Sequence, residues 1–174
     1  MRKPPQVYNL KIPDDDYKMA AVMERDKANF ESSNIWFYVG ADGRNPSFAK
    51  VGITQGDLSS RSYSSANPNY HLFCAFQCTQ DTTNTQLKSI ERNALAYLDS
   101  MFPNRRAHHW ESQRLSECYY DIDFEVFLSC LHYYLFDKYC NNFITAVFMN
   151  EEGVEIGEGI AVLFNPHLPS RARA

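Results

Sequence analysis

The sequence lacks several features that would assign it to common classes of protein. It has no apolar run long enough to cross a membrane, and its first residues, "MRKPPQVYNLKIPDDDYK", contain no apolar segment typical of a secretion signal. It also has no C-x-x-C pair, and its 5 cysteines are an odd number, which disfavours a disulfide framework. We therefore expect a cytoplasmic protein with reduced thiols and no membrane contact.

One hypothesis for the cysteines is a zinc site formed with histidines. Cys74, Cys78, His108 and His109 could supply the ligands, but their spacing matches no common zinc motif. Adjacent histidines in an extended chain also point in opposite directions. The alternative, which we favour, is that the thiols are buried and inert.

Positive charge is not in excess. The chain has 17 lysines and arginines against 21 aspartates and glutamates, a formal net charge of −4. This balance excludes a protein that coats nucleic acid over its whole surface, so any contact with nucleic acid needs a local basic patch. With 174 residues and 44% hydrophobic side chains, the chain is long enough to bury one core.

The pattern of apolar and turn-forming residues predicts an α+β fold in one compact domain. Strands are predicted at 7–12, 34–40, 48–54, 71–78, 143–149 and 154–164. Helices are predicted at 14–30, 58–66, 84–102 and 124–140.

The connections are predicted from glycine, proline and short polar residues. Residues 43–47 are expected to form a turn and 103–122 mostly a loop. Asp57 is expected to cap the helix at 58–66, and Asp121 or Asp123 the helix at 124–140. Gly157 and Gly159 are candidate bulges in a C-terminal hairpin. We divide the chain into an N-terminal strand–helix extension (1–33), a core (34–125) and a C-terminal helix and hairpin packed on the core (126–174).

Glu91 is the most informative single position. On a helical wheel of residues 85–102 it lies within an apolar arc of roughly 140°. That arc is made of Leu87, Ile90, Ala94, Leu95, Leu98, Met101 and Phe102. A carboxylate against a core costs several kcal/mol unless it is paired, protonated or bound to metal. Two interpretations follow: a structural salt bridge, for which Arg61 is the obvious partner, or a metal ligand at the rim of a cleft.

The order of four short features resembles the GIY-YIG nuclease superfamily. "WFYV" is followed by "KVGIT", then by an arginine 9 residues after Gly52, and then by a glutamate in an amphipathic helix. The segment "RLSECYY" also resembles one that follows in a phage and bacterial branch whose second motif is K-[IV]-G-x-T. The resemblance spans residues 34–125 and implies a β-β-α-β-α-α core and a DNA endonuclease.

The resemblance implies roles for individual residues. Tyr38 corresponds to the tyrosine of the first motif, Gly52 to the glycine of the second, Arg61 to the helix arginine and Glu91 to the metal-binding glutamate. Lys50 replaces the tyrosine of the second motif, as is typical of the branch. Trp36 replaces the leading glycine of the first motif. Asn93 and Asn104 are the only candidates for a later asparagine of the family.

These residue types suit phosphodiester hydrolysis. One Mg²⁺ or Mn²⁺ held by Glu91 and water would orient the phosphate, and the fork of Arg61 suits the charge that builds on its oxygens. Tyr38 would act as the general base or relay for water, with its pKa lowered by Lys50. Gly52 would let the substrate phosphate approach the backbone closely. For each residue the alternative is ordinary: a core aromatic, a solvated lysine, a turn glycine.

Contact with DNA is predicted for a local basic set around the loop "PNRRAHH". Its basic members are Lys50, Arg61, Lys88, Arg92, Arg105, Arg106 and His109, with His108 as a further candidate. Gly52 is a non-basic position that is also predicted to contact nucleic acid. Trp110 is expected to be a buried anchor, or else to stack on a base. RNA is an alternative substrate. The rival function is an inactive module for nucleic-acid binding or protein assembly. A further hypothesis is that the protein forms a homodimer through the C-terminal hairpin, or binds a protein partner that supplies specificity.

Overall fold

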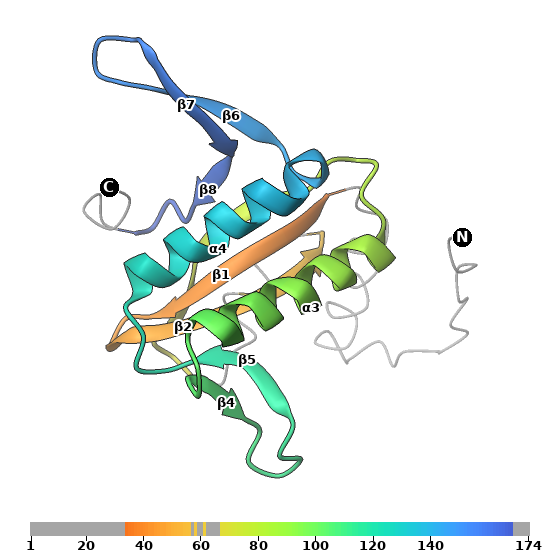
Figure 1. Cartoon of the computed structure of the whole chain (residues 1–174). Coiled ribbons are helices and arrows are strands. Elements are labelled where there is room, and N and C mark those ends of the chain that lie inside the picture. The colour runs from red at the N-terminus through yellow and green to blue at the C-terminus, as the bar shows by residue number, and fades with distance from the viewer. Residues whose placement is uncertain (1–33, 57, 59–60, 62–66, 169–174) are drawn as a thin grey trace, which may run out of the picture.

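The structure is a computed structural model that describes residues 34–56, 58, 61 and 67–168 (Figure 1). The strand predicted at 7–12, the helix at 14–30, the capping residue Asp57 and most of the helix at 58–66 lie outside the described residues. Within the described part, the fold is α+β, as predicted, with two long helices on a mostly antiparallel sheet. No helix in the described part of the chain is both long and apolar enough to cross a membrane.

The main sheet has six strands. In chain order they are β1 (Ile35–Asp42), β2 (Asn45–Gln55), β3 (Tyr70–Gln77), β4 (Arg106–His108), β5 (Leu115–Tyr119) and β8 (Val162–Phe164). Their spatial order is β4-β5-β2-β1-β3-β8. The sheet therefore has the β1–β2 hairpin at its centre and collects its outer strands from distant parts of the sequence.

The β1–β2 turn is tighter than predicted. Asp42 already pairs with Asn45, so residues 45–47 belong to β2 and only Gly43 and Arg44 lie between the strands. The Asp42 side chain holds the turn by accepting a hydrogen bond from the backbone N–H of Arg44 at 2.8 Å. An aspartate that bonds the backbone two residues ahead forms a local turn without further residues, which the prediction at 43–47 did not include.

Two helices cover one face of the sheet (Figure 1). α3 (Asn84–Met101) is capped at its start by a capping box between Thr83 and Gln86. α4 (Phe124–Tyr139) is capped by Asp123, whose side chain accepts a hydrogen bond from the N–H of Val126. Both helices confirm the sequence prediction. A 3-10 turn (Cys140–Asn142) follows α4.

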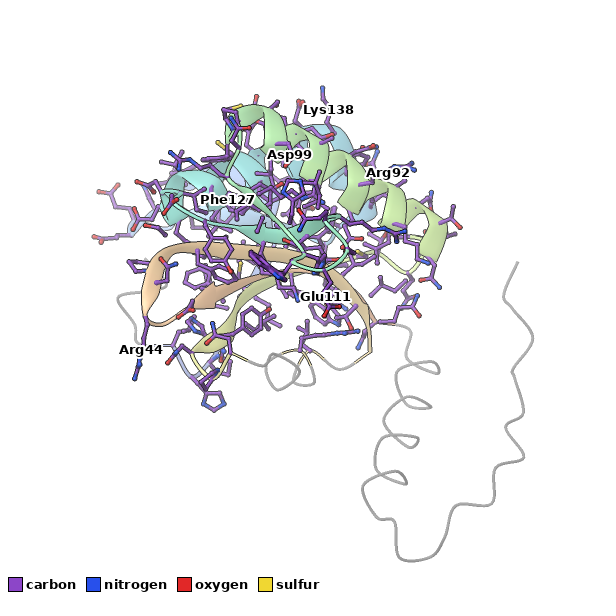
Figure 2. All side chains as sticks on the ribbon, turned by 90° about the horizontal axis from the view of Figure 1, so that it is seen from below. Arg44, Arg92, Asp99, Glu111, Phe127 and Lys138 are labelled. Atoms are coloured by element: carbon purple, nitrogen blue, oxygen red, sulfur yellow. The ribbon has the colours of Figure 1, made fainter. Side chains whose placement is uncertain are left out.

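The main core lies between the helices and the sheet. Phe37 and Val39 of β1 are fully buried there against Phe127 and Leu131 of α4. Phe127 lies between helix layer and sheet, whereas Lys138 is on the outer side of the helices (Figure 2). Because side chains alternate along a strand, Tyr38 points to the opposite face, where a second, smaller cluster forms.

The segment 103–122 is mostly outside regular structure, as predicted, but it also contains two short strands that were not predicted, β4 and β5. Each strand is short, and each is held by contacts that the local sequence does not reveal. Tyr119 pairs with Ala49 of β2 and is fully buried, and the Arg106 guanidinium binds Asp99 of α3 at 2.9 Å. The resulting hairpin projects from the edge of the sheet (Figure 1).

The C-terminal hairpin is confirmed as β6 (Thr145–Met149) and β7 (Glu155–Ile160), which project away from the sheet (Figure 1). The second strand was predicted to continue to residue 164, but the chain breaks at Ala161 and β8 turns away to pair with β3. The register shifts between Phe148 and Met149, next to Gly157. Gly159 is in regular register, so its predicted bulge is wrong.

Candidate active site

Tyr38 and Gly52 are directly opposite each other in the β1–β2 pair, on the face of the sheet away from the helices. The Tyr38 ring lies across Gly52: a β-carbon built on Gly52 would be 2.5 Å from both Cζ and Oη of Tyr38. Tyr38 is only 5% exposed. Gly52 therefore makes room for the phenol of Tyr38, and not for the substrate phosphate as predicted.

Replacing Gly52 with alanine is expected to displace the Tyr38 phenol, because an aromatic ring has no flexible end that could move aside. Overpacking of this kind typically costs about 1–3 kcal/mol of stability. Gly157→Ala is the matched control, since a β-carbon there would have no neighbour within 4 Å. Denaturant unfolding of the two variants measures the difference, and equal stability of both would contradict the placement of Tyr38.

Arg61 lies beside this pair and is anchored by the second motif. Its Nε donates a hydrogen bond of 2.8 Å to Oγ1 of Thr54, a buried residue of β2. Thr54 is two residues after Gly52, so it faces the same side of the sheet. The sequence "KVGIT" thus supplies both the space for Tyr38 and the acceptor that positions Arg61.

Burial governs the ionisation of Tyr38. Desolvation raises the pKa of Tyr38 to about 12, against the opposing influence of the positive charge of Arg61. The expected lowering of this pKa by Lys50 is therefore wrong. The Lys50 Nζ instead lies over the ring of Tyr70, 5.8 Å from its centroid.

Glu91 is half-buried on α3, in the apolar face where the sequence places it. Desolvation, followed by the negative charge of Glu117, raises the pKa of Glu91 to about 7, while Arg106 and Lys88 act in the opposite direction. Glu91 is thus a carboxyl group that is partly protonated at neutral pH. Such a group gains free energy when a cation approaches it.

Glu117 lies beside Glu91 because β5 and α3 pack against each other. The hydroxyl of Tyr119 in β5 shares its one proton between two acceptors in α3, Oδ1 of Asp99 at 2.8 Å and the carbonyl of Leu95 at 3.2 Å. Glu117 precedes Tyr119 by two residues, so both side chains lie on the same side of β5. Glu91 precedes Leu95 by one helical turn. The charge of Glu117 acts on the Glu91 carboxyl group and raises its pKa, so the two carboxylates lie near each other.

The charged groups meet near the outer edge of β2. β5 pairs with β2 only at Ala49 and Lys50, so the edge from residue 51 to 55 has no strand partner among the described residues. The charges of Arg61, Glu117 and Glu91 all act on the Tyr38 phenol. Tyr38 and Lys50 lie on the face away from the helices, where Thr54 anchors Arg61, whereas Glu91 lies on α3 and, like Glu117, reaches Tyr38 through its charge.

Sequence reasoning missed Glu117 as a site residue. It lies inside "RLSECYY", a segment that itself resembles the family, but nothing in that segment indicates that β5 lies beside α3. Asn93 and Asn104 do not join the region: Asn93 donates to the hydroxyl of Tyr139 at 2.8 Å, and Asn104 lies in a turn with a φ of 62°.

The oxygen donors of Glu91 and Glu117 are of the type that Mg²⁺ or Mn²⁺ prefers, and two crowded carboxylates fit a divalent cation. Among the described residues there is no group of three or more His, Cys, Asp or Glu side chains that could hold a metal ion. A metal here would therefore keep several water ligands, as Mg²⁺ commonly does.

The alternative zinc site is not formed. Cys74 and Cys78 are buried in the main core, where burial raises the pKa of both thiols, whereas His108 and His109 are exposed on the β4–β5 hairpin. The prediction of buried, inert thiols is confirmed for these two cysteines. Cys118, Cys130 and Cys140 are only partly buried.

The predicted basic set is divided between exposed and engaged side chains. Lys88 and Arg92 are exposed on α3, and His109 is exposed on the β4–β5 hairpin. Arg105 is paired with Asp121 at 3.4 Å. Arg106, with a side chain only 15% exposed, binds Asp99 and the Ser116 carbonyl, so it holds the hairpin to α3.

Trp110 differs most from its prediction. It is 91% exposed at the end of the β4–β5 hairpin, so the expectation of a buried anchor is wrong. A tryptophan exposed to this extent offers a large aromatic surface for a partner.

Comparisons with protein-family models, with curated proteins and with solved structures found no match to this chain.

Proposed function

We propose that the protein is a metal-dependent endonuclease of the GIY-YIG type that hydrolyses phosphodiester bonds in DNA. One observation carries the proposal: the half-buried Glu91 lies beside Glu117, and both act electrostatically on a buried phenol that also receives the charge of Arg61. A carboxylate pair, a guanidinium and a phenol can supply what hydrolysis of a phosphodiester needs: a cation site, a donor for the developing charge on the phosphate and a group that orients the water.

Each residue has a chemical role in this proposal. Glu91, with Glu117 beside it, would hold the divalent cation, which would supply a Lewis acid to offset charge on the phosphate and the leaving oxygen. Arg61, held by Thr54, donates hydrogen bonds to the phosphoryl oxygens as their charge increases. Tyr38 accepts a hydrogen bond from the attacking water and orients it.

The β4–β5 hairpin is the proposed surface for contact with DNA. It carries Arg105, His108, His109, Trp110 and Arg114, and all five are exposed. Cationic side chains there would contact phosphates, and the ring of Trp110 would stack on an unpaired or splayed base. Lys88 and Arg92 of α3 extend the basic surface.

Replacing Trp110 with alanine is expected to weaken DNA binding about 5- to 100-fold without loss of stability, because stacking on one base contributes about 1–3 kcal/mol. Tyr133→Ala is the matched control, since Tyr133 is also exposed, at 67%, but lies on α4. Fluorescence anisotropy with a labelled single-stranded oligonucleotide measures the affinity. An equal effect of the two variants would contradict a role for the hairpin.

The proposal is tested by incubating the protein with supercoiled plasmid in Mg²⁺, Mn²⁺ or EDTA. Nicking that requires a divalent cation and is lost in Glu91→Gln supports the nuclease. Nicking that persists in EDTA or in Glu91→Gln contradicts it. Parallel incubations with a single-stranded RNA and a branched DNA distinguish the substrate classes.

A second candidate function is a catalytically inactive module that binds nucleic acid or assembles with protein. The observation that favours it is the packing of Trp36 against the same cluster as Tyr38, which leaves the phenol only 5% exposed. Absence of cleavage on every substrate, together with retained DNA binding, would support this alternative. Both functions are compatible with a homodimer or a protein partner. Analytical ultracentrifugation of the purified protein would reveal self-association.

A further inference from the structure

Tyr70 places a second phenol next to the candidate site. It begins β3, on the same side of the sheet as Leu72 and Tyr38, and it is only 7% exposed. Its ring lies over Gly40, where any β-carbon would overlap the phenol. Gly40 thus accommodates Tyr70 as Gly52 accommodates Tyr38, so two glycines in adjacent strands let two tyrosines lie flat on one face.

The Tyr70 hydroxyl is buried and has no hydrogen-bond partner. Among the described residues its Oη is the one buried side-chain polar atom for which no partner exists. A buried hydroxyl without a partner costs about 1–3 kcal/mol, and such groups in folded proteins generally bind a ligand or water. Tyr119 shows the ordinary arrangement, because its buried hydroxyl bonds both Leu95 and Asp99.

One cationic side chain lies directly over Tyr70. The Lys50 ammonium lies over its ring at 5.8 Å, on the strand that pairs with Gly40. The positive charge of Arg61 also acts on the Tyr70 phenol, as do Tyr38, Cys118 and the negative charge of Glu117. Burial raises the pKa of Tyr70, so the hydroxyl keeps its proton and can only be a neutral donor or acceptor.

We propose that the Tyr70 hydroxyl and the Lys50 ammonium form an anion subsite, in which both donate hydrogen bonds to a non-bridging oxygen of a phosphate group. This proposal depends on the proposed function in one respect: the phosphate is taken to be part of a nucleic-acid backbone. Because the hydroxyl is closed off from solvent, the anion must displace a neighbouring side chain. Lys50 is half-exposed and flexible, so it can move with little loss of packing.

The test is thermal unfolding with increasing inorganic phosphate, which requires no catalysis. The wild-type Tm is expected to rise with phosphate, and in Tyr70→Phe the apparent Kd for phosphate is expected to be at least 10-fold weaker. Without phosphate, Tyr70→Phe should be at least as stable as the wild type, because it loses no hydrogen bond. Lys50→Met should also lose the rise in Tm with phosphate, since methionine keeps most of the aliphatic side chain of lysine but not its charge.

Tyr119→Phe is the matched control for removal of a buried tyrosine hydroxyl. It should lower the Tm, because the hydrogen bond that the hydroxyl shares between Asp99 and Leu95 is lost, but leave the response to phosphate unchanged. An unchanged phosphate response in Tyr70→Phe, a fall in Tm similar to that of Tyr119→Phe, or no response in the wild type would each overturn the proposal. A wild type that binds phosphate through Tyr70 but cuts no nucleic acid would refute the nuclease and retain the anion subsite.

Discussion

Replacing Glu91 with glutamine is expected to abolish metal-dependent cleavage and, at the same time, to stabilise the metal-free protein above neutral pH. Loss of cleavage follows because an amide does not neutralise a divalent cation and binds it weakly. The gain in stability follows from the environment of Glu91, in which burial and the charge of Glu117 penalise the ionised carboxylate. A glutamine has the same shape and carries no charge.

The pH dependence has a definite sign. Folding raises the pKa of Glu91 from its ordinary value of 4.5 to about 7, so between these values the folded protein binds more protons than the unfolded chain. The free energy of unfolding of the wild type therefore falls as pH rises through this range. Glu91→Gln lacks this contribution, so its advantage over the wild type should be larger at pH 8 than at pH 5, by about 2 kcal/mol after allowance for partial exposure.

Urea unfolding in EDTA at pH 5 and at pH 8 measures this difference. Glu152→Gln is the control, since Glu152 is exposed in the turn of the β6–β7 hairpin and should show no such change. In Mg²⁺ the stability advantage of Glu91→Gln over the wild type should shrink or reverse, because only the wild type gains stability from the cation. A Glu91→Gln variant that is less stable than the wild type at pH 8 would mean that Glu91 is a structural ion-pair partner.

Replacing Arg61 with alanine is expected to lower the rate of cleavage about 10²- to 10³-fold, because removal of one donor to a developing oxyanion typically costs about 2.7–4 kcal/mol of barrier. Arg61→Lys should recover only part of the rate. A lysine keeps the charge but loses both the planar fork and the Nε–H that Thr54 accepts. Thr54→Val should lower the cleavage rate by a smaller factor, because it keeps the guanidinium and removes only the hydroxyl that accepts its Nε–H.

Single-turnover rates with protein in excess over DNA separate this effect from weaker binding. Arg44→Ala is the matched control, since Arg44 is exposed in the β1–β2 turn, away from the helix layer to which the Glu91 helix, α3, belongs (Figure 2). If Arg61→Ala and Arg44→Ala cut at the same rate, Arg61 takes no part in the chemical step. The position of Arg61 beside Tyr38 would then be structural only.

The elements that local sequence signals describe are those that the sequence predicts well. The apolar spacing of α3 and α4 is continuous over several turns, and Thr83 and Asp123 supply caps from side chains next to each helix. The β1–β2 hairpin has two short apolar runs separated by a polar turn, which are also local signals. These features predict the α+β class and place Glu91 on an apolar helix face.

The short outer strands are not predictable in this way. β4 and β5 have 3 and 5 residues, and they form because Tyr119 enters the core and Arg106 binds Asp99. β8 separates from β7 because its partner is β3, many residues earlier in the chain. Strand pairing between distant segments leaves no periodic signal in either segment, so the local sequence shows a loop or a continuous strand instead.

The candidate site divides along the same line. The order and spacing of residues along the chain predict Tyr38, Arg61 and Glu91 as site residues, because a resemblance of motifs is a property of the linear sequence. Glu117 and Tyr70 belong to the region for spatial reasons only: β5 lies beside α3, and Gly40 lets a phenol from β3 lie flat against β1. Residue types and helical periods are properties of a linear chain, whereas burial, charge proximity and an unpartnered hydroxyl arise only when distant segments pack together.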